Sequence, residues 1–316
     1  MSRHIYSLFL AVTFLLPATL YGQGGSNMEY FGNINYATYP NSRDFYSVYI
    51  NSGASTYHGD LGSVWPGLAN GQLGFSQLRY SPVLFGIGAT YRLPIGRSGN
   101  LQTKYKGLSI RAEVNTYRIS GADSLSTEDT WRVNRRGLSF FAQNIDANVV
   151  AQVDLTRYKF RLSNQAGTRA RITTYAIAGV GLTTNNPYVR YTDSTTDRLF
   201  NLRKVRTEGV KYSPVVLTIP MGIGVQLQFE GVPVVFGIEG SYRLSFTDYL
   251  DDVGGYYADP ASFDNDIQRY LADPTGTHSA GDQRAGLDSN DGYVFYNFRL
   301  AYYFKNRTIG QLLGGR

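Results

Sequence analysis

The stretch VVLTIPMGIGVQLQF, Val215 to Phe229, alternates between two kinds of side chain and decides the fold class of this chain. Its odd-numbered positions are all apolar: Val215, Leu217, Ile219, Met221, Ile223, Val225, Leu227 and Phe229. The even-numbered positions are mostly small or polar, as at Thr218, Gly222 and Gln226. Because neighbours along a β-strand point to opposite sides, the pattern predicts a strand with one wholly apolar face. It is also longer than the roughly 9 to 11 residues that a tilted strand needs to cross a bilayer.

Seven further runs alternate in a similar way, at residues 45–57, 83–93, 108–117, 141–155, 173–182, 234–247 and 294–304. Eight antiparallel strands can close into a barrel that has no exposed edge. We therefore expect an all-β fold: an eight-stranded antiparallel transmembrane β-barrel of the outer-membrane type, with long extracellular loops and short periplasmic turns.

The charged residues of these runs fall on the less apolar face and indicate which face is inside. They are Arg92, Arg111, Glu113, Asp146, Asp154, Glu239, Arg243 and Arg299. An Arg near the bilayer midplane costs about 2 to 4 kcal/mol when it faces lipid, so these residues are predicted to face the interior. The interior of an eight-stranded barrel is just wide enough for side chains to fill, so we expect paired charges and no diffusion pore.

The alternative is a soluble barrel of the lipocalin type, which has the opposite polarity: apolar inside and polar outside. Alternation alone does not separate the two. Four features favour the membrane barrel: an export signal, the absence of cysteine, the long apolar faces, and aromatic residues at strand ends, namely Tyr91, Phe229, Tyr302 and Phe304.

The N-terminus is basic, then apolar, then small and polar, which is typical of a secretory signal peptide. We predict a signal peptide at 1–22, a periplasmic lead-in at 23–43, the barrel at 44–304 and a periplasmic tail at 305–316. The predicted location is the cell outer membrane, with lipid around the barrel. That compartment excludes nucleic acid as a partner, although the net charge is +6.

Four long connections, at residues 58–75, 120–136, 183–212 and 247–292, alternate with shorter ones. The shorter ones are predicted to be periplasmic, and two of them hold basic sets without an acidic residue between their ends: Arg97, Lys104 and Lys106, then Arg157, Lys159, Arg161, Arg169 and Arg171. A basic rim of this kind could dock an acidic periplasmic partner or contact lipid phosphates. It could equally be a solvated turn.

The stretch FTDYLDDVGGYY, residues 246–257, opens the longest connection and carries three carboxylates. Its spacing does not match a calcium-binding loop, and nothing around it indicates the groove of a glycosidase. We interpret the aspartates as turn caps and hydrogen-bond acceptors at the outer rim, with Tyr249, Tyr256 and Tyr257 as interfacial anchors.

We expect no metal, no cofactor, no small-molecule substrate and no enzymatic activity. His58 beside Asp60 is the one pair that would suit an outer-membrane hydrolase, and an ordinary polar loop is the favoured interpretation.

Several segments together resemble the PorG-like (DUF6089-type) outer-membrane barrels of Bacteroidetes: STYHGDLG, RRGLSFFAQNID, RTEGVKYS, IPMGIGVQ, GIEGSYRLSFTDYLDDVGGYY and NDGYVFYNFRLAYYF. The most specific part contains Phe246, Thr247, Asp248, Tyr249, Leu250, Asp251 and Asp252. The resemblance implies a component of the type IX protein secretion system, in which a barrel contacts the periplasmic ring formed by a lipoprotein and its partner.

One departure is that Phe304 is followed by KNRTIGQLLGGR, whereas such barrels usually end on an aromatic residue. The alternative function is an independent structural or adhesive surface barrel, similar to OmpA or OmpX, that binds ligands through its long loops.

Overall fold

A computed structural model describes residues 28–29, 46–61, 83–93, 107–125, 136–161, 169–286 and 290–304 of the chain. Its eight long strands are β2 (Tyr46–His58), β3 (Leu84–Arg92), β4 (Leu108–Ala122), β5 (Ser139–Arg161), β6 (Arg169–Thr184), β9 (Val215–Phe229), β10 (Val234–Ser245) and β11 (Gly292–Phe304). All eight coincide with the predicted runs. The largest differences are in β5, which continues past the predicted end at residue 155, in β4, which continues past 117, and in β6, which begins before 173.

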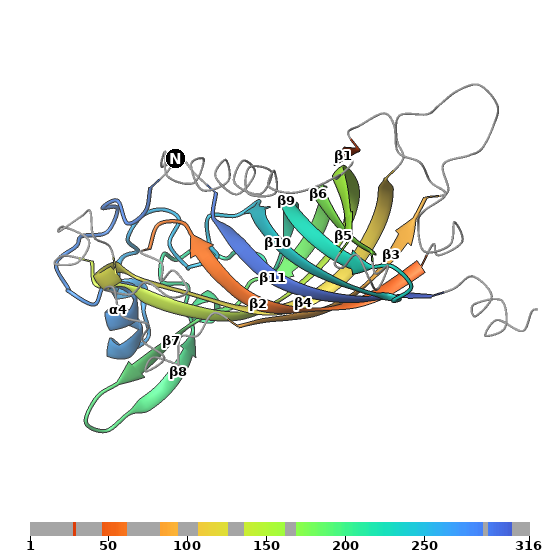
Figure 1. Cartoon of the computed structure of the whole chain (residues 1–316). Coiled ribbons are helices and arrows are strands. Elements are labelled where there is room, and N and C mark those ends of the chain that lie inside the picture. Colours follow the sequence, from red (N-terminus) through yellow and green to blue (C-terminus); the bar gives the residue numbers. More distant parts are fainter. Residues whose placement is uncertain are drawn as a thin grey trace, which may run out of the picture.

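The eight strands form a closed antiparallel barrel (Figure 1). Each strand pairs with its neighbours in the wall, and β11 returns to pair with β2 from Gly292 opposite His58 to Phe304 opposite Tyr46. The ladder β4–β5 completes the ring on the other side. The predicted fold class is therefore confirmed.

The two faces of the wall have opposite chemistry. Large apolar side chains are exposed on the outside, for example Ile87, Ile238 and Phe298, while Arg111 and Glu239 are buried inside. This is the reverse of a lipocalin, in which the apolar face is inside, and it is the polarity of an outer-membrane barrel. Among the described residues, no helix is long and apolar enough to cross a membrane.

The barrel has two distinct ends. At the turn end, β9 and β10 are joined by a tight turn at 230–233, in which Gly231 has a φ of +82°. The loop end is the opposite end, where the long segment 246–291 connects β10 to β11. At the turn end, β5 extends past β4, whose ladder begins with Leu108 opposite Val153. Beyond that point β5 pairs with β6 and with the short strand β1 (Met28–Glu29).

The loop end carries regular structure of its own: η3 (Asp123–Leu125), β7 (Pro187–Thr192), β8 (Asp197–Asn201), α3 (Leu202–Val205), η4 (Pro260–Ser262) and α4 (Asp266–Ala272). The hairpin β7–β8 lies in a region predicted to be a loop and projects from this end at the lower left of Figure 1. Its turn is closed by Asp193, whose carboxylate accepts hydrogen bonds from the amides of Thr195 and Thr196.

Several predicted features lie outside the described residues. These are the signal peptide at 1–22, the tail at 305–316, and the first basic set, Arg97, Lys104 and Lys106.

Candidate functional site

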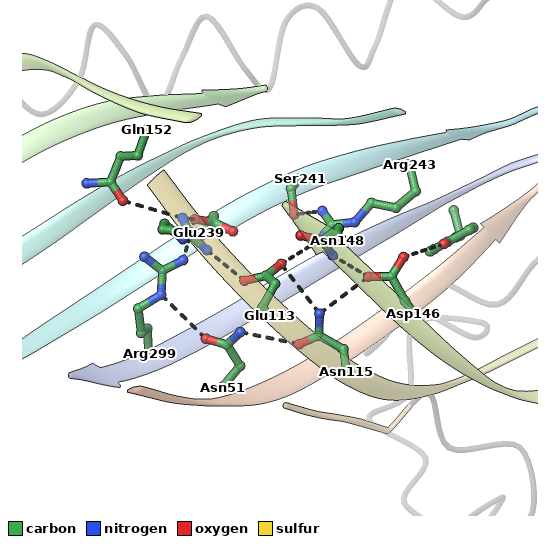
Figure 2. A network of polar contacts seen from close by, with 12 residues as sticks. Asn51, Glu113, Asn115, Asp146, Asn148, Gln152, Glu239, Ser241, Arg243 and Arg299 are labelled. Atoms are coloured by element: carbon green, nitrogen blue, oxygen red, sulfur yellow. Dashed lines mark hydrogen bonds and ion pairs between the residues drawn. The ribbon is translucent and has the colours of Figure 1, made fainter. Parts of the chain in front are cut away.

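The lumen of the barrel is filled by a network of ion pairs (Figure 2). Arg111 on β4 lies 2.7 Å from Glu239 on β10, the strand diametrically opposite in the wall. Arg111 also lies 2.9 Å from Glu113, two residues further along β4. Because the contact between Arg111 and Glu239 spans the full width of the interior, the network closes the barrel at mid-height.

The network balances its charges locally. Glu113 accepts from Arg111 and Arg243, with Nη2 of Arg243 at 3.1 Å, and Glu239 accepts from Arg111 and Arg299. Each glutamate thus has two guanidinium partners, which compensate for the loss of water around a buried carboxylate. Seven of the eight residues predicted to face the interior are buried there, and the eighth, Arg92, has a side chain that is 16% exposed and lies 3.6 Å from Asp154.

Two tyrosines fill the lumen beside this network because they pack onto glycines of adjacent strands. A Cβ at Gly88 would lie 2.3 Å from the ring of Tyr49, and a Cβ at Gly224 would lie 2.3 Å from the ring of Tyr175. The guanidinium of Arg299 lies 4.8 Å from the Tyr49 ring centroid and 5.6 Å from that of Tyr175. A void of about 10 Å³ beside Tyr49 and Arg299 has room for about one water molecule.

An aromatic layer lies between this network and the loop end. Tyr117 and Tyr293 stack with their ring centroids 4.6 Å apart, and Phe295 packs against both. The hydroxyl of Tyr293 donates to Asp146 at 2.9 Å, which joins the aromatic layer to the polar lumen.

The stretch at residues 246–257, here named the cap segment, folds into the mouth of the barrel at the loop end. Leu250 and Val253 are fully buried and belong to the same apolar cluster as Tyr57 and Tyr293. Asp251 and Asp252 accept hydrogen bonds, as expected of these aspartates, but both are buried in the mouth of the barrel with these apolar residues.

The tyrosines of the cap segment are also not all interfacial anchors. Tyr249 stacks on Tyr212 with ring centroids 4.9 Å apart, and Tyr257 is buried and stacks on His278 at 4.2 Å. Tyr256 is exposed, so it is the one tyrosine of the three in a position to meet an interface.

Asp251 shares a contact with Asp291, the residue that precedes β11. The hydroxyl of Tyr57 lies 2.6 Å from Oδ2 of Asp251 and 2.8 Å from Oδ1 of Asp291. Burial raises the pKa of both carboxyls well above the ordinary value of an aspartate. The charge of Asp291 raises the pKa of Asp251 further, and the charges of Asp248 and Asp60 raise that of Asp291.

Asp252 joins the cap segment to the connection between β8 and β9. It adopts a φ of +70°, and its carboxylate accepts from the hydroxyls of Thr207 and Tyr212, the latter at 2.7 Å. Burial raises the pKa of Asp252 to about 6, against the opposing charge of Arg284. The guanidinium of Arg284 donates to the Asp252 carbonyl at 2.8 Å.

Two buried arginines extend these contacts to all four long connections. Arg136 donates to Asp123 and to the carbonyl oxygens of Asp60 and Arg284. Arg284 pairs with Glu208 at 3.1 Å. The loop end is therefore closed by a connected cap.

No group of three His, Cys, Asp or Glu side chains suited to a metal ion occurs in the described part of the chain. Asp248 is half-buried, and burial, with Asp60 and Glu208 nearby, raises its pKa to about 7. His58 packs edge-to-face on Tyr242, with ring centroids 6.3 Å apart, and the Asp60 carboxylate accepts from the amide of Gly286.

The second basic set is placed differently from the prediction of a turn. Arg157 is buried in β5 and pairs with Asp154 at 2.6 Å, so it is not part of an exposed partner surface. Further along the hairpin, the register places Lys159 opposite Arg171 and Arg161 opposite Arg169. Arg169 is half exposed and lies 3.8 Å from Glu230 in the β9–β10 turn.

No protein-family model and no curated protein matches this chain. Among solved structures, the N-terminal β-barrel domain of Pseudomonas aeruginosa OprF matches with a TM-score of 0.27 and 10% identity, covering 82% of this chain and 97% of that one. Ail, the attachment invasion locus protein of Yersinia pestis, solved in complex with the heparin analogue sucrose octasulfate, matches with a TM-score of 0.28 and 11% identity over 82% and 97% of the two chains.

Proposed function

We propose that this protein is a non-conducting outer-membrane barrel that acts through its two ends as an anchor for other proteins. The observation that carries the proposal is the closure of the interior, by ion pairs across the lumen between Arg111 and Glu239 and by the cap above them. A barrel filled in this way has no path for a solute, so its surfaces are what remain for function.

More specifically, we propose a non-enzymatic role in the type IX secretion system, with the turn end docking the periplasmic ring lipoprotein and its partner. The sequence resemblance supports the choice of this machine. The basic extension of β5 and β6 supports the choice of the turn end, because it reaches past β4 and carries cations on both strands.

The register of this extension gives the expected chemistry of the partner. Like charges directly opposite each other across two strands are destabilising. The backbone register places Lys159 opposite Arg171 and, two residues further along, Arg161 opposite Arg169. Glu230 is the carboxylate that lies near Arg169. An acidic surface on a partner would relieve this repulsion and increase the rate of association.

The test is to tag the protein, extract it from outer membranes in mild detergent, and identify the co-purifying proteins by mass spectrometry. Wild type is expected to recover the ring components in a fixed proportion, and the double variant Arg161→Glu/Arg169→Glu to lose them. The matched control is Arg198→Glu/Lys204→Glu, which reverses two cations at the loop end and should retain them. Recovery of the barrel without ring components would contradict the secretion role.

A second candidate is an independent surface barrel that binds a ligand through its loop end. It is favoured by the projecting hairpin β7–β8, on which Leu199 is exposed and Tyr191 packs against Tyr270 of α4. Replacing residues 189–200 with a short glycine–serine linker should then reduce adhesion while type IX export stays normal. The secretion role predicts instead that variants at the turn end reduce type IX export and leave adhesion normal.

A further inference from the structure

The hydroxyl of Tyr57 lies within hydrogen-bond distance of two carboxyl groups, and one hydroxyl hydrogen is not enough for both hydrogen bonds. The hydroxyl oxygen lies 2.6 Å from Asp251 and 2.8 Å from Asp291. A phenol has a single hydrogen and can donate it along one of two contacts this short. The other contact is a hydrogen bond only if a carboxyl group donates to the Tyr57 oxygen. Two hydrogen bonds at these distances therefore need a proton on Asp251 or on Asp291.

Direct ion pairs to Asp251 and Asp291 are absent from the part of the chain that the structure describes. The amides of Val253 and Leu250 donate to the two carboxylates, at 2.9 and 2.8 Å.

The other groups that face the pair are mostly acidic or neutral. The negative charge of Asp60 opposes ionisation of both carboxyls, and the charge of Asp248 opposes ionisation of Asp291. Arg136 is the cation that faces Asp251, and it already binds Asp123 directly. The phenols of Tyr212 and Tyr242 complete the set, facing Asp251 and Asp291 respectively.

The backbone is fitted closely around the same three groups. A Cβ at Gly59 would lie 1.9 Å from the Tyr57 hydroxyl and 1.9 Å from Oδ1 of Asp291, so only glycine fits there. The three side chains come from the end of β2, the cap segment and the start of β11, which are far apart in the sequence. Their contact therefore fastens the cap segment to the barrel wall.

We propose that Asp251, Tyr57 and Asp291 form a proton-dependent latch, which holds the cap segment in the barrel mouth while the two carboxyls share a proton and releases it when that proton is lost. Loss of the proton leaves two carboxylates side by side in the closed cap, and release of the cap segment lets water enter the mouth and stabilise both. The loop end would then expose the aromatic layer formed by Tyr117 and Tyr293.

The direction of the pH dependence follows from linkage. Burial raises the pKa of both carboxyls in the closed cap, so the closed state binds a proton more tightly than the open state does. The stabilisation is complete below the ordinary pKa of an aspartate and is lost as the pH rises toward the raised value. Between those limits the opening constant increases by up to about tenfold per pH unit.

Limited trypsin digestion of the whole protein, folded in detergent micelles, tests the latch because Arg284 is buried beneath the closed cap. Cleavage after Arg284 is divided by cleavage after Lys204, which is exposed at the same end, so that the pH dependence of trypsin itself cancels. In wild type the ratio is expected to rise at least about tenfold between about pH 6 and pH 8.

Two variants and a control complete the test. Asp291→Asn and Asp251→Asn each place a permanent amide donor beside Tyr57, so the ratio should rise much less than in wild type between pH 6 and pH 8, and the rise that remains belongs to Asp248 and Asp252. Asp259→Asn, at an exposed carboxylate of the same connection, should behave as wild type. A flat ratio in the wild type overturns the latch, and this holds even if an Asn variant fails to fold. An unchanged rise in both folded Asn variants overturns it as well.

Discussion

The lumen and the cap both bury carboxylates, and they neutralise them in different ways. In the lumen, Glu113 and Glu239 each have two guanidinium partners, and both strands that carry them are fixed in the wall. In the cap, Asp251 and Asp291 contact each other through Tyr57. Ion pairs between side chains that ionise far from neutral pH do not respond to physiological pH, whereas a pair that holds a proton does.

The difference indicates a division of labour along one barrel. The lumen is a permanent closure, since releasing Glu239 would leave buried charges without partners. The cap also depends on the contact of Asp251 and Asp291 with Tyr57, which needs a proton, so we expect a rise in pH to open it. Four predictions test or sharpen this comparison.

The largest effect is expected from breaking the lumen network. Glu239→Gln removes a charge that Arg111 and Arg299 share and leaves buried guanidinium groups uncompensated. We expect the free energy of unfolding to fall by about 3 to 5 kcal/mol. Urea unfolding of the barrel in lipid vesicles measures it. The matched control is Asp197→Asn, which breaks an exposed pair with Arg190 and should cost about 0 to 1 kcal/mol. An equal loss of unfolding free energy in the two variants would mean that the buried ion pairs of the lumen contribute no more to stability than an exposed pair.

The comparison also assumes that the lumen lies within a lipid-facing wall. Ile238 on β10 is 61% exposed and Leu199 on β8 is 59% exposed, but only Ile238 lies in the apolar outer face of the barrel. Ile238→Arg should destabilise the folded barrel in vesicles by about 2 to 4 kcal/mol. Leu199→Arg should change little, since its hairpin projects from the loop end. A similar cost at both positions would contradict the predicted membrane boundary.

A smaller effect is expected from disturbing how tyrosine fills the lumen. Gly224→Ala would place a methyl group 2.3 Å from the ring of Tyr175, so the ring must move, and the expected cost is about 1 to 3 kcal/mol of unfolding free energy. Gly240→Ala, with no atom within 4 Å of the new Cβ, is the control and should be neutral or slightly stabilising. Equal stability of the two variants in urea would show that the ring is not held against the wall.

The smallest effect concerns the half-buried Asp248, which sharpens the contrast in pH response. Burial and the nearby Asp60 and Glu208 raise its pKa to about 7, so its contribution to cap stability is present at low pH and is lost as the pH rises through neutrality. In Asp248→Asn, hydrogen exchange of residues 247–258, corrected for the intrinsic rate, should lose the part of its pH dependence centred near pH 7. Asp264→Asn, at an exposed position, should leave the profile unchanged.

Most of the wall could be predicted from the sequence, because a strand with one face in lipid and one in a polar lumen must alternate strictly. The eight runs located all eight strands. The interior charges were identified from the free-energy cost of exposing an arginine to lipid, which places the charged face of each strand inside. The ends of β5 and β6 were missed because Arg157, Lys159 and Arg171 suggested a turn. These residues lie instead on strands that continue past the end of β4, after a register shift between Asp154 and Thr156 that interrupts the alternation.

The cap could not be predicted in this way. Arg136 and Arg284 stand in long connections with no local signal to distinguish them from solvated residues, and yet both are buried. The sequence does place three carboxylates together at the start of the longest connection, but it does not show that Tyr57 and Asp291 lie beside one of them. The strain at Asp252, with a φ of +70°, likewise has no signature in the sequence.

The sequence by itself therefore determined the number of strands, the polarity of the wall and the identity of the lumen charges, because each depends on local alternation against a fixed solvent boundary. Only the tertiary structure decided which charges pair across the lumen, that the acidic segment folds inward, and that Asp251 and Asp291 share the Tyr57 hydroxyl. Those contacts join residues up to 234 positions apart, and their geometry is fixed by closure of the barrel rather than by any local pattern.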